Sequence, residues 1–121
     1  MQKSVLIALA AVFMVALAFM TTSAVTAEET ITGMLVEAGC AAMGGAEPSD
    51  EHVACMVRCA LNGDPIGIMT DDGLYKITGD WGSSNADALA ELMAKQVRAT
   101  GETSEEGGEL LLEVSTLELA K

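Results

Sequence analysis

The sequence predicts a mainly β domain with five strands and two short helices. Three observations carry this prediction. Apolar runs of strand length recur between glycine-rich turns, an Asp-Asp-Gly segment joins two such runs, and two stretches carry apolar residues at helical spacing. A chain of 121 residues holds one such domain at most. The order along the chain is strand, helix, strand, strand, helix, strand, strand.

Residues 1–27 have the pattern of an export signal. Lys3 precedes an uncharged apolar segment over residues 5–19, and small residues lead to Ala27, where we expect cleavage, with Ala24 as the alternative. An uncleaved membrane anchor is the other interpretation, although the segment is shorter than the ~20 residues of a spanning helix. The expected mature domain is residues 28–121, periplasmic or secreted, without stable membrane insertion once the signal is removed.

The first predicted strand begins at Ile31, is bent at Gly33 and ends at Gly39-Cys40. After a loop of small residues, Ser49 is placed to cap a helix over about residues 49–62. Asn62-Gly63 is a common signal for the end of a helix. This helix is therefore inserted between the first two strands.

The middle of the chain predicts a hairpin followed by a loop and a second helix. Residues 65–70 and 74–79 flank Asp71-Asp72-Gly73, the strongest hairpin signal in the chain. We expect residues 81–84 to be a loop and the helix to begin at Ser84 or Asn85.

Two strands complete the chain, over residues 96–102 and from Leu110 onward, joined by a turn at residues 105–108. The apolar positions change from even to odd numbers near Ser115-Thr116, which predicts a bulge or strand end there. Five strands with a helix between the third and fourth match an OB-type barrel with a helical insertion between strands 1 and 2. A small α+β sandwich is the alternative, because strand order is not visible in a sequence.

The chemistry is concentrated in the inserted helix. Cys40 ends the first strand, and His52, Cys55 and Cys59 follow in the pattern C-x11-H-x2-C-x3-C. At ~100° per residue the three helical residues point to one side, toward Cys40. Three thiolates and one imidazole suit tetrahedral Zn²⁺, and soft sulfur ligands also suit Cu(I). Accessory sulfur ligands are available from Met56 and Met43.

Two other interpretations of the cysteines stay open. In an oxidising compartment Cys40 pairs with Cys55 or Cys59 in a disulfide that stabilises the domain by about 3 kcal/mol. The protein is then a stapled interaction or ligand-binding domain without metal. Alternatively, a reactive cysteine pair acts in a thiol-disulfide relay.

Composition excludes several function classes. The 18 acidic against 6 basic residues, net charge −12, and the four aromatic side chains argue against nucleic-acid binding. The single histidine leaves none for a hydrolytic triad, so we expect a binding protein rather than an enzyme. The partner is an unspecified protein or small ligand, and Trp81 is either its contact residue or a lid over the barrel mouth.

Four segments together resemble a group of small exported bacterial proteins with an OB-like domain. They are TITGMLVEAGC at 30–40, HVACMVRCA at 52–60, GDPIGIMTDDG at 63–73 and KQVRATGET at 95–103. The group shares a G-x-x-V-D-x-x-C opening and a helix with H-x-x-C-x-x-x-C. Cys40, His52, Cys55 and Cys59 match these positions, and Glu37 stands where an acidic residue, often Asp, is expected. The resemblance implies the OB-like fold and the Cys/His site, and no activity.

Overall fold

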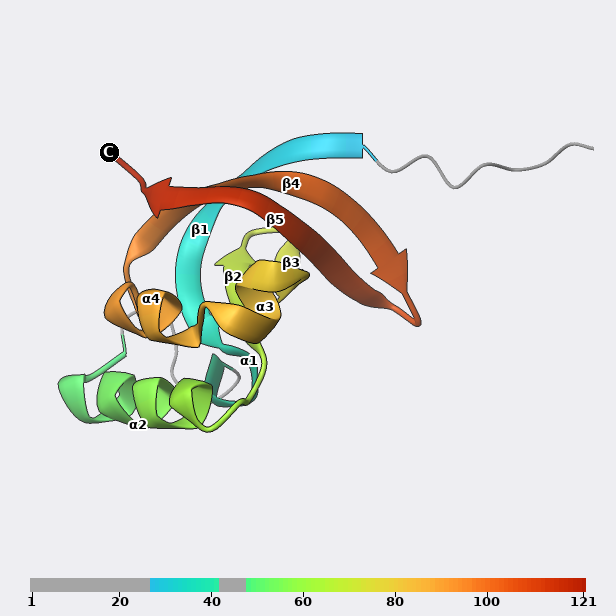
Figure 1. Ribbon diagram of the computed structural model, residues 1–121. Helices are drawn as coiled ribbons and strands as arrows, with labels where there is room; N and C mark the ends of the chain where they lie inside the picture. The colour runs from blue at the N-terminus through green and yellow to red at the C-terminus, as the bar shows by residue number, and fades with distance from the viewer. Residues whose placement is uncertain (1–26, 42–47) are drawn as a thin grey trace, which may run out of the picture.

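The computed structural model describes residues 27–41 and 48–121. In these residues five strands form one closed barrel, to which four short helices are added (Figure 1). The strands close in the order β1-β2-β3-β5-β4, with β4 pairing back onto β1. β3 and β5 are parallel, and the other pairs are antiparallel. The elements are β1 (Ala27–Glu37), α1 (Ala38–Ala41), α2 (Asp50–Leu61), β2 (Ile66–Thr70), β3 (Gly73–Thr78), α3 (Asp80–Ser84), α4 (Ala86–Glu91), β4 (Gln96–Glu106) and β5 (Glu109–Leu119).

The closed five-stranded barrel and the helical insertion between the first two strands confirm the predicted fold class. The sandwich alternative is wrong, because β4 bonds to β1 and leaves no open sheet. Residues 1–26 lie outside the described residues, so the export signal and its cleavage after Ala27 stay predictions. Met43 also lies outside them. Among the described residues no helix is long and apolar enough to cross a membrane.

Two of the four helices were not predicted. The segment expected to be a loop at residues 81–84 forms α3, because the carbonyl of Gly79 accepts the N–H groups of Gly82 and Ser83 and closes a helical turn. Gly79 itself has φ +76°, a conformation that favours glycine. The other unpredicted helix, α1, depends on a side-chain interaction described below.

The ends of α2 lie where the sequence predicts them. The hydroxyl of Ser49 accepts the backbone N–H of His52 at 3.2 Å, which satisfies one of the free donors of the first turn. At the other end Asn62 is the C-cap, and Gly63 follows with φ +97°. Local capping therefore sets the length of the helix that carries two of the cysteines.

The predicted irregularity in the last strand is a β-bulge. Thr100 pairs with Thr116 and Gly101 with Val114, so Ser115 is the extra residue, and its hydroxyl donates to the carbonyl of Thr100 at 2.9 Å. This bulge accounts for the change of the apolar residues from even to odd positions along the strand. It lets Leu117, beyond the bulge, pack against the same core as the buried Leu112 and Val114.

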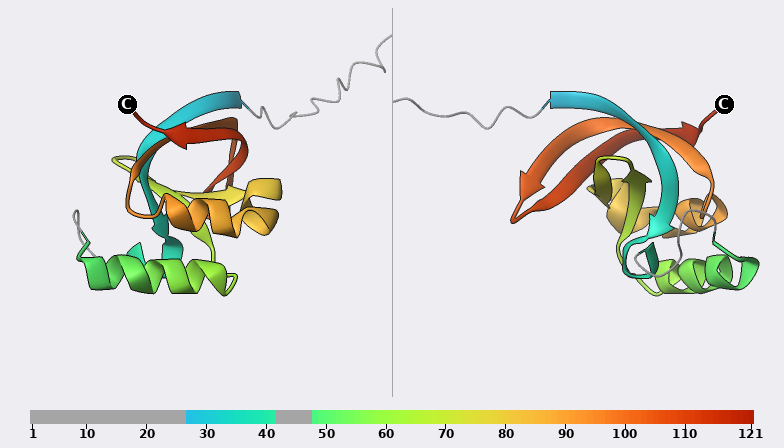
Figure 2. Two further views of the ribbon diagram at one scale, coloured as in Figure 1. Left: turned by 60° about the vertical axis from the view of Figure 1, so that its left-hand side comes forward. Right: turned by 180° about the vertical axis from the view of Figure 1, so that it is seen from behind.

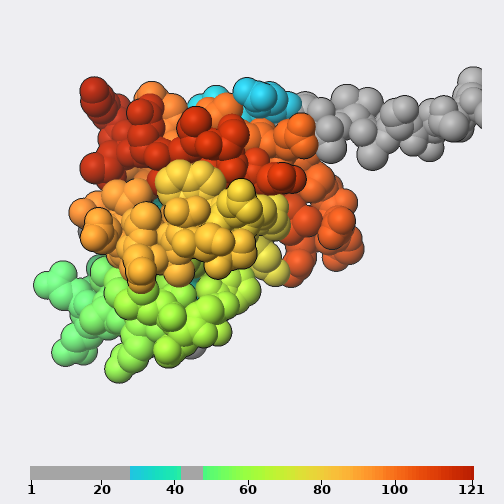
Figure 3. All heavy atoms as spheres, viewed as in Figure 1, coloured from blue at the N-terminus to red at the C-terminus, as the bar shows by residue number. Residues whose placement is uncertain are grey.

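The helices gather at one end of the barrel. α2 packs against α4 and β1, and the two further views agree that it lies across this end (Figure 2). In the space-filling view α2 forms a layer below α3 and α4 (Figure 3). Leu35 and Val36 are adjacent in β1 yet both are buried, because the barrel core covers one face of the strand and α2 the other. The end of β1 is thus enclosed on both sides.

We expect Gly101→Ala to lower the free energy of unfolding by about 2 kcal/mol or more, because the added methyl group would collide with the carbonyl oxygen of Glu113 in β5. Urea denaturation measures the change. Ser104→Ala, on the exposed part of the same strand, is the control and should stay within about 0.5 kcal/mol of wild type. Equal stabilities of the two variants would contradict the close strand approach.

Candidate metal centre

Three sulfur atoms from two helices meet beside the barrel. Cys40 lies on α1, and Cys55 and Cys59 lie one turn apart on α2. Their Sγ atoms are all within 4.8 Å of one another. All three are free thiols, so no disulfide joins any pair of these cysteines. The topology therefore brings together the residues that the sequence separates by up to 19 positions.

Cys40 is held in place by the carboxylate of Glu37, the last residue of β1. One carboxylate oxygen accepts the N–H of Gly39 at 2.8 Å, and the other accepts the N–H of Cys40 at 2.7 Å. These are the free donors of the first turn of α1, so Glu37 acts as its cap. A neighbouring bond, from the N–H of Ala38 to the carbonyl of Pro65 at 2.8 Å, ties the same turn to the segment that follows α2.

His52 contacts the backbone of the cysteine turn rather than the three sulfurs. Its Nε2 lies 3.1 Å from the carbonyl oxygen of Cys40. A carbonyl only accepts, so Nε2 is the donor in this hydrogen bond. Among the described residues, the group of ligand atoms that lie mutually within 4.8 Å contains the three sulfurs and not the imidazole. His52 therefore fastens α2 to α1 in this conformation.

The carboxylate and the thiols influence each other's ionisation. Burial raises the pKa of Glu37, but the hydrogen bonds from the thiol of Cys40 and from two backbone N–H groups outweigh it, so the net pKa is below 4.5. The same bond to Glu37 is the largest cause that raises the pKa of Cys40 to about 12. Burial, followed by the nearby Cys55, raises the pKa of Cys59. Cys40 and Cys59 are therefore held as protonated thiols.

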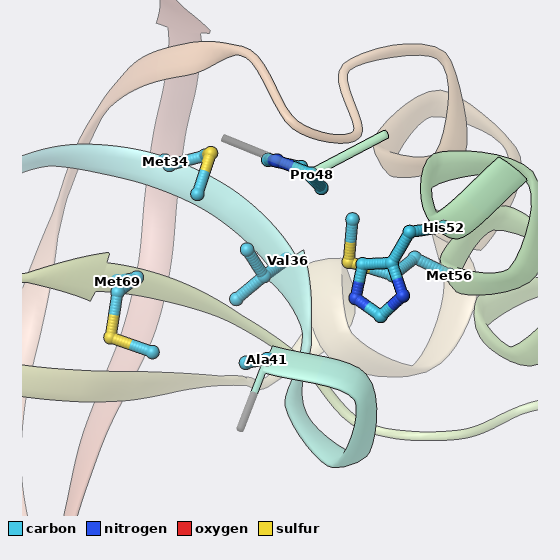
Figure 4. A pocket seen from close by; sticks show the side chains of 7 residues that line it. All are labelled: Met34, Val36, Ala41, Pro48, His52, Met56 and Met69. Carbon is cyan, nitrogen blue, oxygen red and sulfur yellow. The ribbon is translucent and has the colours of Figure 1, made fainter. Parts of the chain in front are cut away.

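Two of the accessory residues named from the sequence, Met56 and Trp81, lie within the described residues. Met56 is 1% exposed and lines an apolar pocket between α2 and the outer face of β1 and β2 (Figure 4). The pocket also includes His52, and Met34 and Met69, which are paired across the two strands. Met43 lies outside the described residues. Trp81 lies on α3, half-buried against the core.

The role of Glu37 as a cap was missed by reasoning from the sequence. The signal is an acidic residue at the end of an apolar strand, two positions before Gly39-Cys40. Glu37 is 3% exposed, and such a buried carboxylate requires hydrogen-bond donors close at hand. A donor-rich turn immediately after the strand was therefore predictable in principle.

One side of the sulfur cluster reaches solvent. Cys40 and Cys59 line a surface groove together with Glu37, Asp64, Lys76 and Glu109. Two of the three cysteines are half-buried rather than enclosed. Three closely spaced thiols with access to solvent can bind a thiophilic ion or be oxidised to a disulfide, and both reactions require loss of the thiol protons.

We expect Glu37→Gln to reduce the free energy of unfolding at neutral pH by about 1.5–3 kcal/mol, because hydrogen bonds to a buried charged acceptor are lost. The folded pKa is below 4.5, so this stabilisation is complete above the unfolded pKa and disappears as the pH falls through the folded pKa. Urea unfolding at successively lower pH should show the difference in stability between the two proteins shrinking as Glu37 becomes protonated. Glu105→Gln, an exposed control at the β4–β5 turn, should match wild type throughout.

In a variant with Cys55→Ser and Cys59→Ser, we expect the remaining Cys40 to react slowly with iodoacetamide, because Glu37 is the first cause of its raised pKa. Adding Glu37→Gln should accelerate alkylation by about tenfold or more, the effect of one pKa unit. Mass spectrometry of timed samples measures the rate. Equal rates in both backgrounds would show that the carboxylate does not hold the thiol proton.

Comparisons with known protein families, with curated proteins and with solved structures find no match for this chain. The expected kinship with small exported OB-like proteins therefore stays a prediction. The function has to be inferred from the chemistry of the site itself: three free thiols, a buried carboxylate and an imidazole at the junction of barrel and insertion.

Proposed function

We propose that this protein is an exported metal-binding protein that holds Zn²⁺ or Cu(I) through Cys40, Cys55 and Cys59. One observation carries the proposal: three sulfur atoms from two separate helices lie mutually within 4.8 Å without forming a disulfide. Thiolates are preferred ligands of both ions. His52 supports the cluster by fixing the backbone of Cys40, as second-layer hydrogen bonds commonly do at metal sites.

The charge of the chain is consistent with a cation as ligand. Acidic residues outnumber basic ones by three to one, and the groove beside the sulfurs is lined by three carboxylates and one amine. Such a surface raises the local concentration of cations. The pattern of residues 1–27 supports export, and an exported protein would meet metal ions outside the cytoplasm.

A thiol-disulfide relay is the second candidate, because any two of the three thiols are close enough to pair after a small movement. The raised pKa values of Cys40 and Cys59 count against it, since the attacking species in disulfide exchange is the thiolate. The raised pKa values do not prevent metal binding, because the binding energy of the ion displaces the thiol protons. We therefore expect the apparent affinity of the protein for the metal ion to rise with pH.

The decisive experiment is elemental analysis and thiol counting on mature protein purified without oxygen. We expect about one Zn or Cu per chain, and three thiols that become reactive when a chelator removes the ion. Cys55→Ser should lower the affinity for the ion by about tenfold or more. Ala54→Ser, an exposed neighbour on the same helix, is the matched control and should bind as wild type does.

The other outcomes identify the alternatives. One free thiol without stoichiometric metal would establish a disulfide staple and overturn the proposal. Three free thiols that bind neither Zn²⁺ nor Cu(I), one of which reacts rapidly with a small disulfide, would establish the relay instead.

A further inference from the structure

The surface groove next to the sulfur cluster contains a carboxylate that the structure leaves uncommitted. Asp64 lines this groove with Cys40 and Cys59. Its side chain is exposed and has no hydrogen-bond or ion-pair partner within the described ranges, 27–41 and 48–121. Asp64 is therefore an exposed carboxylate without a partner beside the cluster.

The backbone at position 64 is anchored to both helices that carry the sulfurs. The N–H of Asp64 donates to the carbonyl of Cys59 at 3.1 Å, which ties it to the end of α2. The carbonyl of the next residue, Pro65, accepts the N–H of Ala38, two residues before Cys40. Position 64 thus stays beside the cluster whatever rotamer its side chain adopts. Rotation of an exposed aspartate costs little free energy, because no packing has to be broken.

The other two candidates for a fourth ligand are already engaged. Both oxygens of Glu37 accept backbone N–H groups of α1, and releasing them would uncap the turn that carries Cys40. The imidazole of His52, like the carboxylate of Asp64, lies outside the group of mutually close ligand atoms, and its Nε2 proton is donated to the carbonyl of Cys40. Recruiting either side chain would disrupt a bond that positions a sulfur ligand. Recruiting Asp64 disrupts none.

We propose that Asp64 is the fourth ligand, so that the complete site is Cys40, Cys55, Cys59 and Asp64 around Zn²⁺. This inference rests on the proposed metal-binding function and specifies its ion. Zn²⁺ takes four ligands in a tetrahedron and accepts carboxylate oxygen together with thiolate sulfur. Cu(I) prefers soft sulfur and would gain little from the aspartate. The aspartate is the solvent-side ligand, and the three sulfurs lie deeper.

Zinc affinity measured against a chromophoric chelator tests the inference on the full mature chain. We expect Asp64→Ala to weaken Zn²⁺ binding by about ten- to a hundredfold, and Cu(I) binding by less than about threefold. Asp71→Ala is the matched control, because Asp71 is also an exposed turn aspartate but lies at the far end of β2. It should change neither affinity. Circular dichroism should show wild-type folding for both variants, since neither side chain is buried.

A gain-of-ligand variant tests the reach of position 64. With Co²⁺ in place of Zn²⁺, Asp64→Cys should raise the sulfur-to-cobalt charge-transfer absorption from the level of three thiolates to that of four. Asp71→Cys adds a cysteine at the control position and should leave the spectrum unchanged. All samples are kept reduced, so that an added cysteine does not form a disulfide.

The same measurements distinguish a protein that binds no metal from one that binds metal without Asp64. If wild type binds neither Zn²⁺ nor Cu(I), the metal-binding function itself is wrong. If wild type binds Zn²⁺ and neither Asp64 variant differs from its Asp71 control, Asp64 is not a ligand. If His52→Ala then lowers zinc affinity and removes the nitrogen ligand from the cobalt spectrum, the imidazole is the fourth ligand and the inference is overturned.

Discussion

The interaction on which the site depends is the hydrogen bonding of one buried carboxylate. Glu37 ends the first strand, and its two oxygens hold the N–H groups of the following turn. A buried charge without donors is costly, so the turn must close around it. Within the described part of the chain no buried side-chain oxygen or nitrogen lacks a partner. The position of Cys40 is the direct consequence.

The sulfur cluster lies where the barrel meets the inserted helix α2. Cys40 is fixed to the barrel through β1, whereas Cys55 and Cys59 are fixed to α2, which packs on α4 and β1. An ion bound by all three would link the inserted helix to the barrel. Metal binding at such a junction would also stabilise the fold, because the unfolded chain does not preserve the site.

Features that depend on short stretches of chain were predictable. The hairpin at residues 70–73, the caps of α2 and the bulge at Ser115 all leave local signals in residue type or parity. The helices α1 and α3 were not predicted. The first is capped by the side chain of Glu37, and the second begins at a glycine with φ +76°. Neither condition follows from periodicity.

The amino-acid sequence alone determined the five strands and the helices α2 and α4, and it put two cysteines and the histidine on one inserted helix, because helical spacing is a local property. Only the tertiary structure decided that Cys40 meets the other two sulfurs and that His52 reaches the carbonyl of Cys40. The parallel pairing of β3 with β5 was likewise settled by barrel closure. Contacts between residues distant in the chain depend on how all the strands pair at once, and no single segment encodes that.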